Sequence, residues 1–353
     1  MITTTRMNTR TNNKCPIDIV TGFLGSGKTT LLGNILREGE FEGASVIINE
    51  YGKAGLDHRL IRRVKERTVL LAGGCVCCNR REDLIAELKN MLNEHQSGAI
   101  SLDRVVIETT GLADPAPILF SILTHPLLVH HYYIETVAVC LDAVNGEMHL
   151  ENNPESVKQI AAADRVIITK TDISTPENLE RLRQRIVQIN PAAHIQEAVH
   201  GHVSVPILTP VTGLLASRRA TNQPPRDEKS DGSAAGHATN IRSMAIGFDE
   251  PLDWLAFGIW LSMLLQKHGE KVFRVKGIVD VGEDGPIVLD GVQHIIHPPR
   301  HLEDWKDYET RQSQIVFIMR DIEPRRIMDS LTAFQHLIGA RPEIQEINLE
   351  PFA

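Results

Sequence analysis

Eight residues near the N-terminus have the types and spacing to hold a phosphate group. Residues 22–29 read Gly-Phe-Leu-Gly-Ser-Gly-Lys-Thr, a G-x-x-x-x-G-K-T pattern. In such a loop the glycines let backbone N–H groups point at phosphate oxygens, and the start of the following helix adds positive potential. Lys28 is placed to reach the β- and γ-phosphates of a nucleoside triphosphate, and Thr29 to put its hydroxyl on Mg²⁺.

The segments on either side of this loop support that interpretation. Residues 17–20 are short and β-branched, which predicts a strand. Residues 30–37 have the apolar spacing of a helix. The pattern alone arises by chance in roughly one chain in a hundred of this length. Strand, glycine loop and helix in this order therefore predict a nucleotide site rather than an ordinary surface loop.

A second group of residues suggests metal chemistry. Cysteines occupy positions 75, 77 and 78, directly after two glycines and before a predicted helix over residues 82–92. A helix N-terminus lowers the pKa of a nearby thiol, and the thiolate is the form that binds metal. Thiolates select soft ions such as Zn²⁺ or Cu⁺ over Mg²⁺. The alternative is a set of inert thiols. Cys15 and Cys140 adjoin strand-like runs and are expected to be small buried hydrophobes.

Two later strands end in residues that suit the same nucleotide. Residues 104–107 predict a strand that runs into Glu108-Thr109-Thr110-Gly111. Glu108 there would hold a water molecule of Mg²⁺, and the Gly111 N–H could touch the γ-phosphate. A strand over residues 165–168 runs into Thr169-Lys170-Thr171-Asp172. The Asp172 carboxylate could accept both N1–H and N2–H of guanine, which adenine does not offer, and the stem of Lys170 could lie along the base.

Further strands are predicted over residues 44–49, 69–71 and 136–143. The first leads into a loop at residues 50–57, which lies where a nucleotide-dependent switch loop would be. The carboxyl edge of an open α/β sheet is where ligands bind. An ordinary connecting loop is the alternative reading of residues 50–57.

Length and composition limit the class of protein. The chain has 353 residues, of which 42% are hydrophobic and 23% charged, as in a soluble globular protein with room for two domains. Its net charge of −8 argues against general nucleic-acid or anionic-membrane binding. No apolar run is long enough to span a bilayer, and the polar first 14 residues lack the apolar region of a secretory signal. We therefore expect a cytoplasmic protein.

The fold class predicted is α/β. A loose tail over residues 1–14 would precede a P-loop nucleotide-binding domain with a mainly parallel sheet, residues 15–216. Residues 217–240 are rich in Pro, Gly, Ser and charge, as in a linker. Residues 241–353 would form a smaller α+β domain, with strands over 241–248, 271–281, 286–289, 293–297 and 314–319 and helices over 251–267 and 324–337.

Histidines are possible metal ligands at two other places. His200-Gly201-His202 could bind a metal ion, although surface histidines are common, and we prefer the ordinary interpretation. His294 and His297 stand three apart in a predicted strand, which would point them to opposite faces. A shared metal site for that pair is therefore not expected.

Taken in order, the motifs resemble those of the CobW-type P-loop GTPases, the cobalamin-synthesis W and metallochaperone family. They are G-F-L-G-S-G-K-T-T, N-E-Y-G, G-C-V-C-C, E-T-T-G-L-A-D-P and T-K-T-D. Near the C-terminus, R-V-K-G-I-V-D-V and H-P-P-R-H-L are similar to the family's C-terminal domain. The resemblance covers nearly the whole chain.

The resemblance implies a GTPase with slow intrinsic turnover that delivers a transition metal to a client metalloenzyme, with zinc first and cobalt or iron as alternatives. It implies that Lys28 and Glu108 act in catalysis and that Lys170 and Asp172 read guanine. The metal ligands it implies are Cys75, Cys77 and Cys78, and the phosphate and Mg²⁺ residues are Gly25, Ser26, Gly27, Lys28, Thr29 and Thr30, with Gly111 at the γ-phosphate.

The chain departs from the family pattern at two positions. Lys53 stands where the usual run N-E-F-G-E has a carboxylate that could help to bind metal. Thr169 replaces the Asn of the usual N-K-x-D motif. A threonine hydroxyl can partly substitute for that Asn as a hydrogen-bonding strut, and we expect a looser guanine preference.

Three other functions stay open at this point. One is a dedicated activator of a single metalloenzyme, such as a nitrile-hydratase-like or cobalamin-pathway enzyme. A second is a nucleotide-gated protein-binding switch whose cysteines sense redox state. The third is a plain ATPase or small-molecule kinase. Tight metal binding by the reduced cysteines would separate the metallochaperone from the redox switch, and a preference for GTP over ATP would exclude the third.

Overall fold

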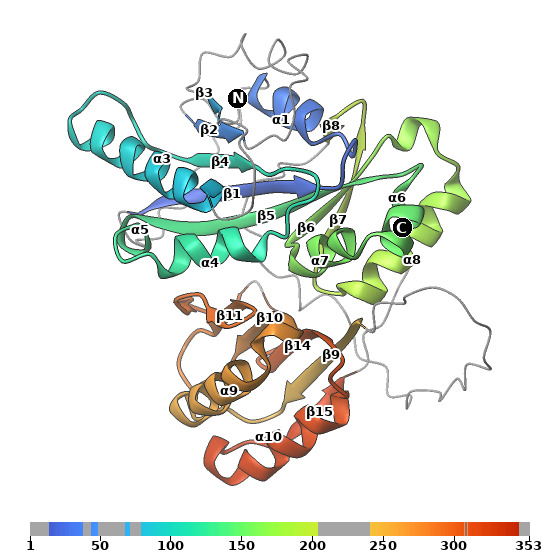
Figure 1. Cartoon of the computed structure of the whole chain (residues 1–353). Helices are drawn as coiled ribbons and strands as arrows, with labels where there is room; N and C mark the ends of the chain where they lie inside the picture. The colour runs from blue at the N-terminus through green and yellow to red at the C-terminus, as the bar shows by residue number, and fades with distance from the viewer. Residues whose placement is uncertain are drawn as a thin grey trace.

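The computed structural model describes residues 14–37, 44–48, 68–70, 79–203, 241–306, 308 and 310–345. The predicted switch loop at residues 50–57, the three clustered cysteines and the predicted linker at residues 217–240 lie outside these ranges, as does nearly all of the predicted tail. The described residues form two sheets, each with its own helices (Figure 1).

The first sheet is parallel except for one edge strand, which confirms the predicted α/β class. Its strands run in the order β3-β2-β4-β1-β5-β6-β7-β8, and only β8 is antiparallel to its neighbour. The strands are β1 (Cys15–Gly22), β2 (Ser45–Ile48), β3 (Thr68–Leu70), β4 (Val105–Glu108), β5 (Tyr132–Asp142), β6 (Arg165–Thr169), β7 (His194–Val199) and β8 (His202–Val203).

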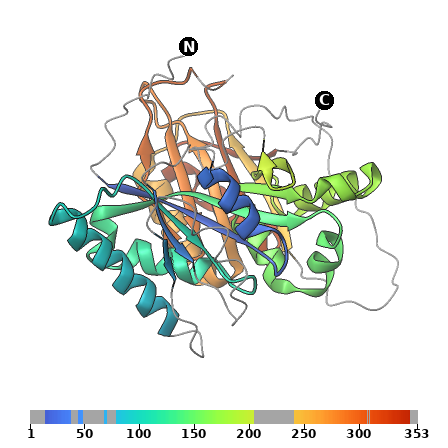
Figure 2. The ribbon, with the colours of Figure 1, turned by 90° about the horizontal axis from the view of Figure 1, so that it is seen from above.

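Helices cover both faces of this sheet, so its central strands are apolar along their whole length. In β4, Val106 faces the cluster formed with α1 (Lys28–Arg37), whereas Val105 and Ile107 face the opposite cluster. Figure 2 shows α1 lying over the first face. The opposite cluster receives side chains from α3 (Asn79–Gln96), α4 (Ala116–Thr124), α5 (Leu128–His131), α6 (Gly146–Asn152), α7 (Pro154–Ala162) and α8 (Pro176–Ile189).

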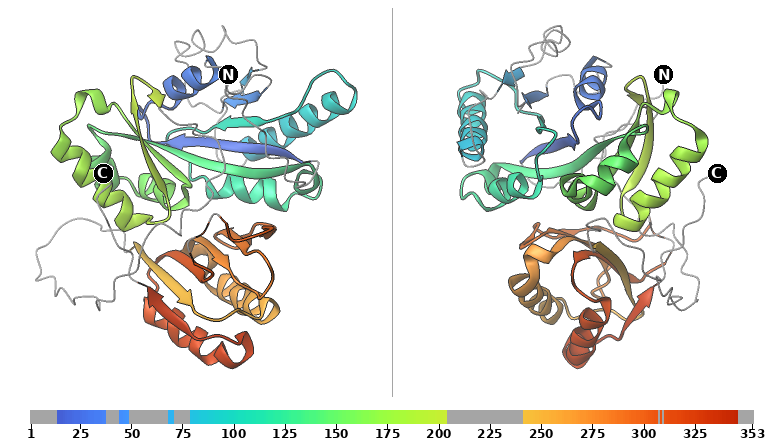
Figure 3. Two further views of the ribbon diagram at one scale, coloured as in Figure 1. Left: turned by 180° about the vertical axis from the view of Figure 1, so that it is seen from behind. Right: turned by 45° about the vertical axis from the view of Figure 1, so that its right-hand side comes forward.

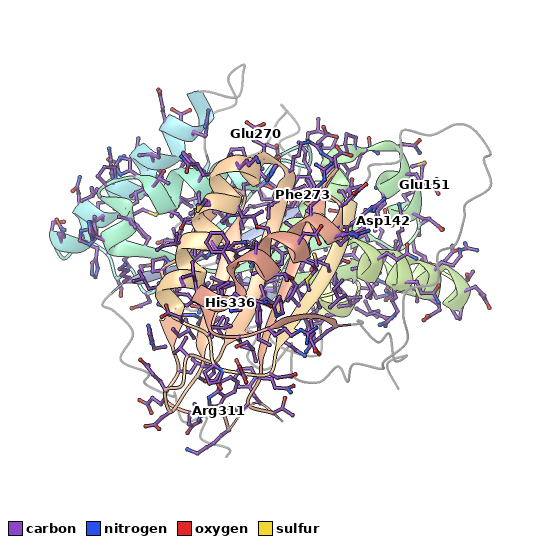
Figure 4. The ribbon with its side chains drawn as sticks, turned by 90° about the horizontal axis from the view of Figure 1, so that it is seen from below. Asp142, Glu151, Glu270, Phe273, Arg311 and His336 are labelled. Carbon is purple, nitrogen blue, oxygen red and sulfur yellow. The ribbon has the colours of Figure 1, made fainter. Side chains whose placement is uncertain are left out.

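The second sheet is antiparallel, with the strand order β12-β11-β10-β14-β9-β15 and β13 paired to β11. Helices α9 (Trp254–His268) and α10 (Pro324–Ile338) lie across one face, as Figure 4 shows from below, where His336 marks α10. The strands are β9 (Ile241–Phe248), β10 (Val272–Val279), β11 (Ile287–Val292), β12 (Ile295–Ile296), β13 (Arg300–His301), β14 (Ser313–Arg320) and β15 (Pro342–Gln345).

Side chains along the strands of the second sheet alternate between its two faces, and one of these faces packs against the first half of the protein. In β14, Ile315 and Phe317 face the core under α9 and α10, where Trp260 donates from Nε1 to Ser330 Oγ at 2.9 Å. Val316 and Ile318 point the other way and pack into the cluster beneath the first sheet. The helices on that face of the first sheet therefore lie between the two sheets, with α1 on the opposite face, a layering that both views in Figure 3 show.

A buried ion network reinforces this interface. Arg274 of β10, 1% exposed, donates to Asp164 Oδ1 at 2.6 Å, to Asp290 Oδ2 at 2.9 Å and to the carbonyl of Ala162 at 2.9 Å. Lys276 donates to the same Asp164 oxygen at 2.7 Å. Burial opposes ionisation of Asp164, but the two cations hold its pKa well below the usual range.

Two of the expected C-terminal elements are shorter than predicted. Helix α9 begins at Trp254 rather than at residue 251, because the Asp253 side chain accepts the Ala256 N–H and caps the helix there. Only Ile295 and Ile296 form the strand expected over residues 293–297. No helix in the described ranges is long and apolar enough to cross a bilayer.

Candidate functional site

The residues predicted to bind nucleotide gather at the carboxyl edge of the first sheet. The phosphate loop follows β1, Glu108 ends β4 and the Thr169–Asp172 segment begins at the end of β6. Strands β4 and β1 are neighbours, and only β5 separates β1 from β6. Because the strands are parallel, their carboxyl ends meet at one edge, which is where α/β sheets bind ligands.

Residues 22–27 form the loop, and α1 begins at Lys28. The Lys28 ammonium donates to the carbonyls of Gly22 at 2.9 Å and Phe23 at 3.0 Å, so it lies across the loop. Gly25 and Gly27 have φ of 72° and 87°, values that favour glycine. A Cβ on Gly22 would lie 2.2 Å from the Cys140 carbonyl oxygen, so only glycine fits at that position.

The predicted Mg²⁺ residues are in direct contact. The Thr29 hydroxyl donates to Glu108 Oε1 at 2.6 Å, although the two residues are 79 positions apart. Glu108 is 4% exposed, and hydroxyl and carboxylate oxygens are the ligands that Mg²⁺ accepts beside a nucleotide. Ser26 Oγ is buried and has no hydrogen-bond partner among the described residues. These polar groups fit a Mg²⁺–nucleotide complex.

The loop after β4 packs against the phosphate loop. A Cβ on Gly111 would lie 2.6 Å from the backbone nitrogen of Leu24. Gln159 of α7 donates to the carbonyls of Gly111 at 3.2 Å and Ala113 at 2.9 Å, which fixes the path of this loop. The expected contact between the Gly111 N–H and a γ-phosphate stays a prediction.

At the end of the site that is predicted to read the base, Thr169 forms hydrogen bonds that tie two segments together. Its hydroxyl donates to the Ser26 carbonyl at 2.7 Å and lies 3.3 Å from the Leu141 carbonyl, joining β6 to the phosphate loop. Lys170 has φ of 59° and donates from Nζ to Asp142 Oδ2 at 2.7 Å. Asp172 follows in a short 3-10 helix over Thr171–Ile173.

Asp142 is a site residue that the sequence reasoning missed. It is 2% exposed, and Val144 and Asn145 donate to it along with Lys170. Burial opposes ionisation, but these hydrogen bonds lower its pKa, so a carboxylate positions Lys170. The sequence does show an acidic residue at the end of an apolar strand, and the next strand of the sheet along the chain leads into Lys170.

The aromatic contact of Phe23 lies on the same edge. Its ring centroid is 4.5 Å from that of His149 on α6, and the rings are inclined at 45°. Burial lowers the pKa of His149. The charge of Asp142 raises this pKa and that of Lys170 lowers it, but burial is the largest cause, so the ring packs as a neutral imidazole. This contact ties the phosphate loop to the helix that follows Asp142.

The two isolated cysteines are buried free thiols, as predicted. Burial raises the pKa of Cys15 and of Cys140 to about 12, so neither is a thiolate at neutral pH. Nowhere in the described ranges do three or more His, Cys, Asp or Glu side chains converge to hold a metal ion. His294 Nδ1 lies 3.0 Å from the Leu265 carbonyl, whereas His297 faces Asp290, so this pair shares no site.

Known proteins match both halves of the chain. Residues 16–197 match the family described as CobW/HypB/UreG, nucleotide-binding domain. Residues 241–335 match the cobalamin synthesis protein cobW C-terminal domain.

Two curated relatives match over most of their length. The zinc chaperone YjiA of Escherichia coli is 32% identical over 307 residues, covering 87% of this chain and 94% of the relative. The zinc-regulated GTPase metalloprotein activator 1 of Schizosaccharomyces pombe is 34% identical over 350 residues, covering 89% and 81%. A crystal structure of a Zn(II)-bound triple mutant of the YjiA GTPase superposes with a TM-score of 0.66 at 25% identity, covering 91% of this chain and 99% of that one.

Proposed function

Because this chain belongs to the CobW/HypB/UreG nucleotide-binding family, we propose that it is a GTP-hydrolysing zinc metallochaperone that delivers zinc to a client metalloenzyme. The observation that carries the proposal is the contact between Thr29 and Glu108 beside the Lys28 ammonium. The chemistry of these groups suits a Mg²⁺–nucleotide complex. The relatives of the chain are named as zinc chaperones and zinc-regulated GTPases, which supports zinc as the cargo.

Each nucleotide residue has a role in this proposal. Lys28 leaves the loop carbonyls to meet the β- and γ-phosphates, and Thr29 and Glu108 hold Mg²⁺, Glu108 through a water molecule. When bound there, Mg²⁺ would neutralise charge on the phosphates as the γ-phosphoryl group passes to water. The N–H groups of the loop and of Gly111 complete the phosphate site. The proposal includes a slow intrinsic turnover.

The base site discriminates through Asp172, with Lys170 along the base. Lys170 is fixed by Asp142, and Thr169 ties the segment to the phosphate loop. We propose that this arrangement favours GTP over ATP, because adenine has no donor pair for the Asp172 carboxylate.

Strand register supports coupling between the nucleotide and the proposed zinc ligands Cys75, Cys77 and Cys78. Ile48 of β2 is in register with Leu70 on one side and with Glu108 on the other. Strand β3 therefore ends, at Leu70, near the predicted Mg²⁺ residues, and Cys75 follows Leu70 by five residues in the sequence.

The proposed cycle uses this proximity. GTP binding favours the arrangement of the loops that holds zinc on the three thiolates, and hydrolysis weakens it, so zinc passes to the client. Linkage makes the effect reciprocal, because zinc must then tighten GTP binding by the same factor. A coupling of about 1–3 kcal/mol, or roughly 5- to 150-fold in affinity, is typical.

The experiment is an anaerobic competition titration of Zn²⁺, Co²⁺ and Fe²⁺, with and without a non-hydrolysable GTP analogue and Mg²⁺. It uses the full chain, Cys77→Ser and the matched control Cys15→Ala, which removes a buried thiol at the start of β1. The expected result is zinc binding that tightens with the analogue, is lost in Cys77→Ser and is kept in Cys15→Ala.

Two other results would change the assignment. Tighter binding of Co²⁺ or Fe²⁺ would replace zinc as the cargo and favour a dedicated activator of one metalloenzyme. Metal binding that ignores the GTP analogue, or that survives Cys77→Ser, would overturn the coupling and bring the redox-sensing switch forward.

A further inference from the structure

The turn between β7 and β8 brings a histidine to the base-reading carboxylate. His200 Nδ1 lies 3.5 Å from Asp172 Oδ2. The imidazole is 76% exposed and the Asp172 side chain 21% exposed. The sequence alone predicts only a surface residue at His200, because its pattern reveals neither β7 nor the approach of the following turn to residues 169–172.

Although the His200 side chain is exposed, its backbone is held firmly. Asn34 of α1, 6% exposed, donates from Nδ2 to the His200 carbonyl at 3.0 Å. His200 and Gly201 have φ of 50° and 77°, and a Cβ on Gly201 would lie 2.8 Å from Asn34 Nδ2 and 3.0 Å from Thr30 Cγ2. The turn is therefore packed against the helix that begins with Lys28 and Thr29.

The base-reading segment is tied to the same strand. The Thr171 hydroxyl donates to the Ala198 carbonyl of β7 at 3.3 Å. The neighbouring polar groups have other partners, because the Thr169 hydroxyl binds Ser26 and the Lys170 ammonium binds Asp142. Among the described residues, His200 is the one basic side chain within 4 Å of the Asp172 carboxylate.

Guanine recognition needs both oxygens of that carboxylate in the plane of the base, because N1–H and N2–H donate side by side in that plane. A carboxylate at the end of a short, partly exposed side chain rotates unless another group fixes it, and fixing it before binding reduces the entropy lost on binding. A donor at one oxygen does this without blocking the second lone pair of that oxygen.

We propose that His200 is a positioning residue for guanine recognition. Its Nδ1–H holds the Asp172 carboxylate in the orientation that accepts guanine N1–H and N2–H. The turn geometry set by Asn34 and Gly201 makes this orientation depend on the packing of the phosphate-binding helix. The inference deepens the proposed function and rests on it, because it assumes a guanine nucleotide at this site.

The test is a double-mutant cycle measured by calorimetric titration of GDP with Mg²⁺ into the full chain. His200→Ala should weaken GDP binding about three- to tenfold, the range of a single hydrogen bond. In an Asp172→Ala background the same substitution should change nothing. His200→Asn, which keeps a side-chain N–H donor, should recover part of the loss, and His202→Ala on the same hairpin is the matched control.

The outcomes separate this inference from the proposed function. A parent protein that binds no GDP overturns both. GDP binding that is unaffected by His200→Ala, or weakened by the same factor with and without Asp172, overturns the positioning role alone. Unfolding temperatures of the nucleotide-free variants should match that of the parent, because the imidazole is mostly exposed; a large drop would mean that the substitution acts through the fold.

Discussion

At the scale of single residues, two buried carboxyl groups of the first sheet are stabilised very differently. Asp142 receives hydrogen bonds from Val144, Asn145 and Lys170, which lower its pKa despite burial. Asp18, fully buried on β1, pairs with Arg104 through Oδ2, but Oδ1 has no hydrogen-bond partner among the described residues. Burial outweighs Arg104 and raises the pKa of Asp18 to about 7.

Asp18→Asn should therefore change how stability depends on pH. The folded pKa of about 7 exceeds the unfolded value near 4, so the folded protein binds this proton more tightly, and the stability it contributes is lost as pH rises toward 7. From pH 5 to pH 8, Asp18→Asn should gain about 1–3 kcal/mol relative to the parent in urea unfolding. Exposed Asp103→Asn is the control, and a pH-independent difference would refute the assignment.

Glu108→Gln tests the Mg²⁺ side of the site. The substitution keeps the shape of the side chain and removes its charge, so the Mg²⁺-dependent part of GDP affinity should fall at least about tenfold, or 1.4 kcal/mol. The measurement compares GDP titrations with Mg²⁺ and with EDTA. Glu151→Gln, on an exposed part of α6 labelled in Figure 4, should behave like the parent. Equal Mg²⁺ dependence in both variants would remove Glu108 from the ion site.

The sequence predicts these residue contacts only where a motif follows a recognisable strand. Lys28, Thr29 and Glu108 could be placed together because their strands are apolar and parallel. The approach of His200 to Asp172 could not be predicted. Strand β7 carries polar residues at Gln196 and Glu197 and lies second from the edge, so its pattern does not stand out from a loop.

At the scale of elements, the loops after β1 and β4 form one unit. Their contact depends on Gly111, whose position admits no side chain beside the Leu24 nitrogen. Sequence patterns predict that both loops bind phosphate. Their distance of approach depends on the register of β1 with β4, which pairs Val20 with Glu108, and no local pattern encodes that register.

Gly111→Ala should push these two loops apart. The added methyl would lie 2.6 Å from the Leu24 nitrogen, and overpacking of this kind typically costs about 1–3 kcal/mol. We expect affinity for a GTP analogue to fall by more than about tenfold with the fold retained, measured by titration and by thermal unfolding. Gly258→Ala in α9, where the added methyl meets open space, is the control. Unchanged affinity for the GTP analogue in Gly111→Ala would show that nucleotide binding does not depend on the close contact between these two loops.

Helix α9 illustrates how element ends escape prediction. Its apolar residues predict a helix that starts at residue 251. The cap at Asp253 fixes the true start, because its side chain accepts the Ala256 N–H while Leu252 is buried in the core. Burial of Leu252 is a tertiary effect, which the sequence does not display.

At the scale of the whole molecule, the ion network around Arg274 links the second sheet to the nucleotide domain. Asp164 directly precedes β6, whose other end leads into the base-reading segment. It accepts from Arg274 and Lys276, and its second oxygen accepts the Val137 N–H at 2.9 Å. A strand reading Arg274-Val275-Lys276 usually marks a solvent-facing side. Composition therefore predicts two domains but not this interface.

Asp164→Asn should destabilise the whole chain strongly. It leaves the buried Arg274 and the partly buried Lys276 with less compensating charge, and breaking a buried pair typically costs about 3–5 kcal/mol. Asp290→Asn should cost less, because Asp290 is 24% exposed and Arg274 keeps Asp164. Urea unfolding of both variants at pH 7 gives the comparison. The reverse order would place the main anchor of the interface at Asp290.

The position of the tryptophans has a spectroscopic consequence. All three lie in the C-terminal half, Trp254 and Trp260 on α9 and Trp305 before β14, whereas the nucleotide residues belong to the other sheet. Tryptophan fluorescence therefore reports on the half of the molecule that lies outside the proposed nucleotide site. A change in tryptophan emission when a nucleotide binds would therefore report communication between the two halves without an added label.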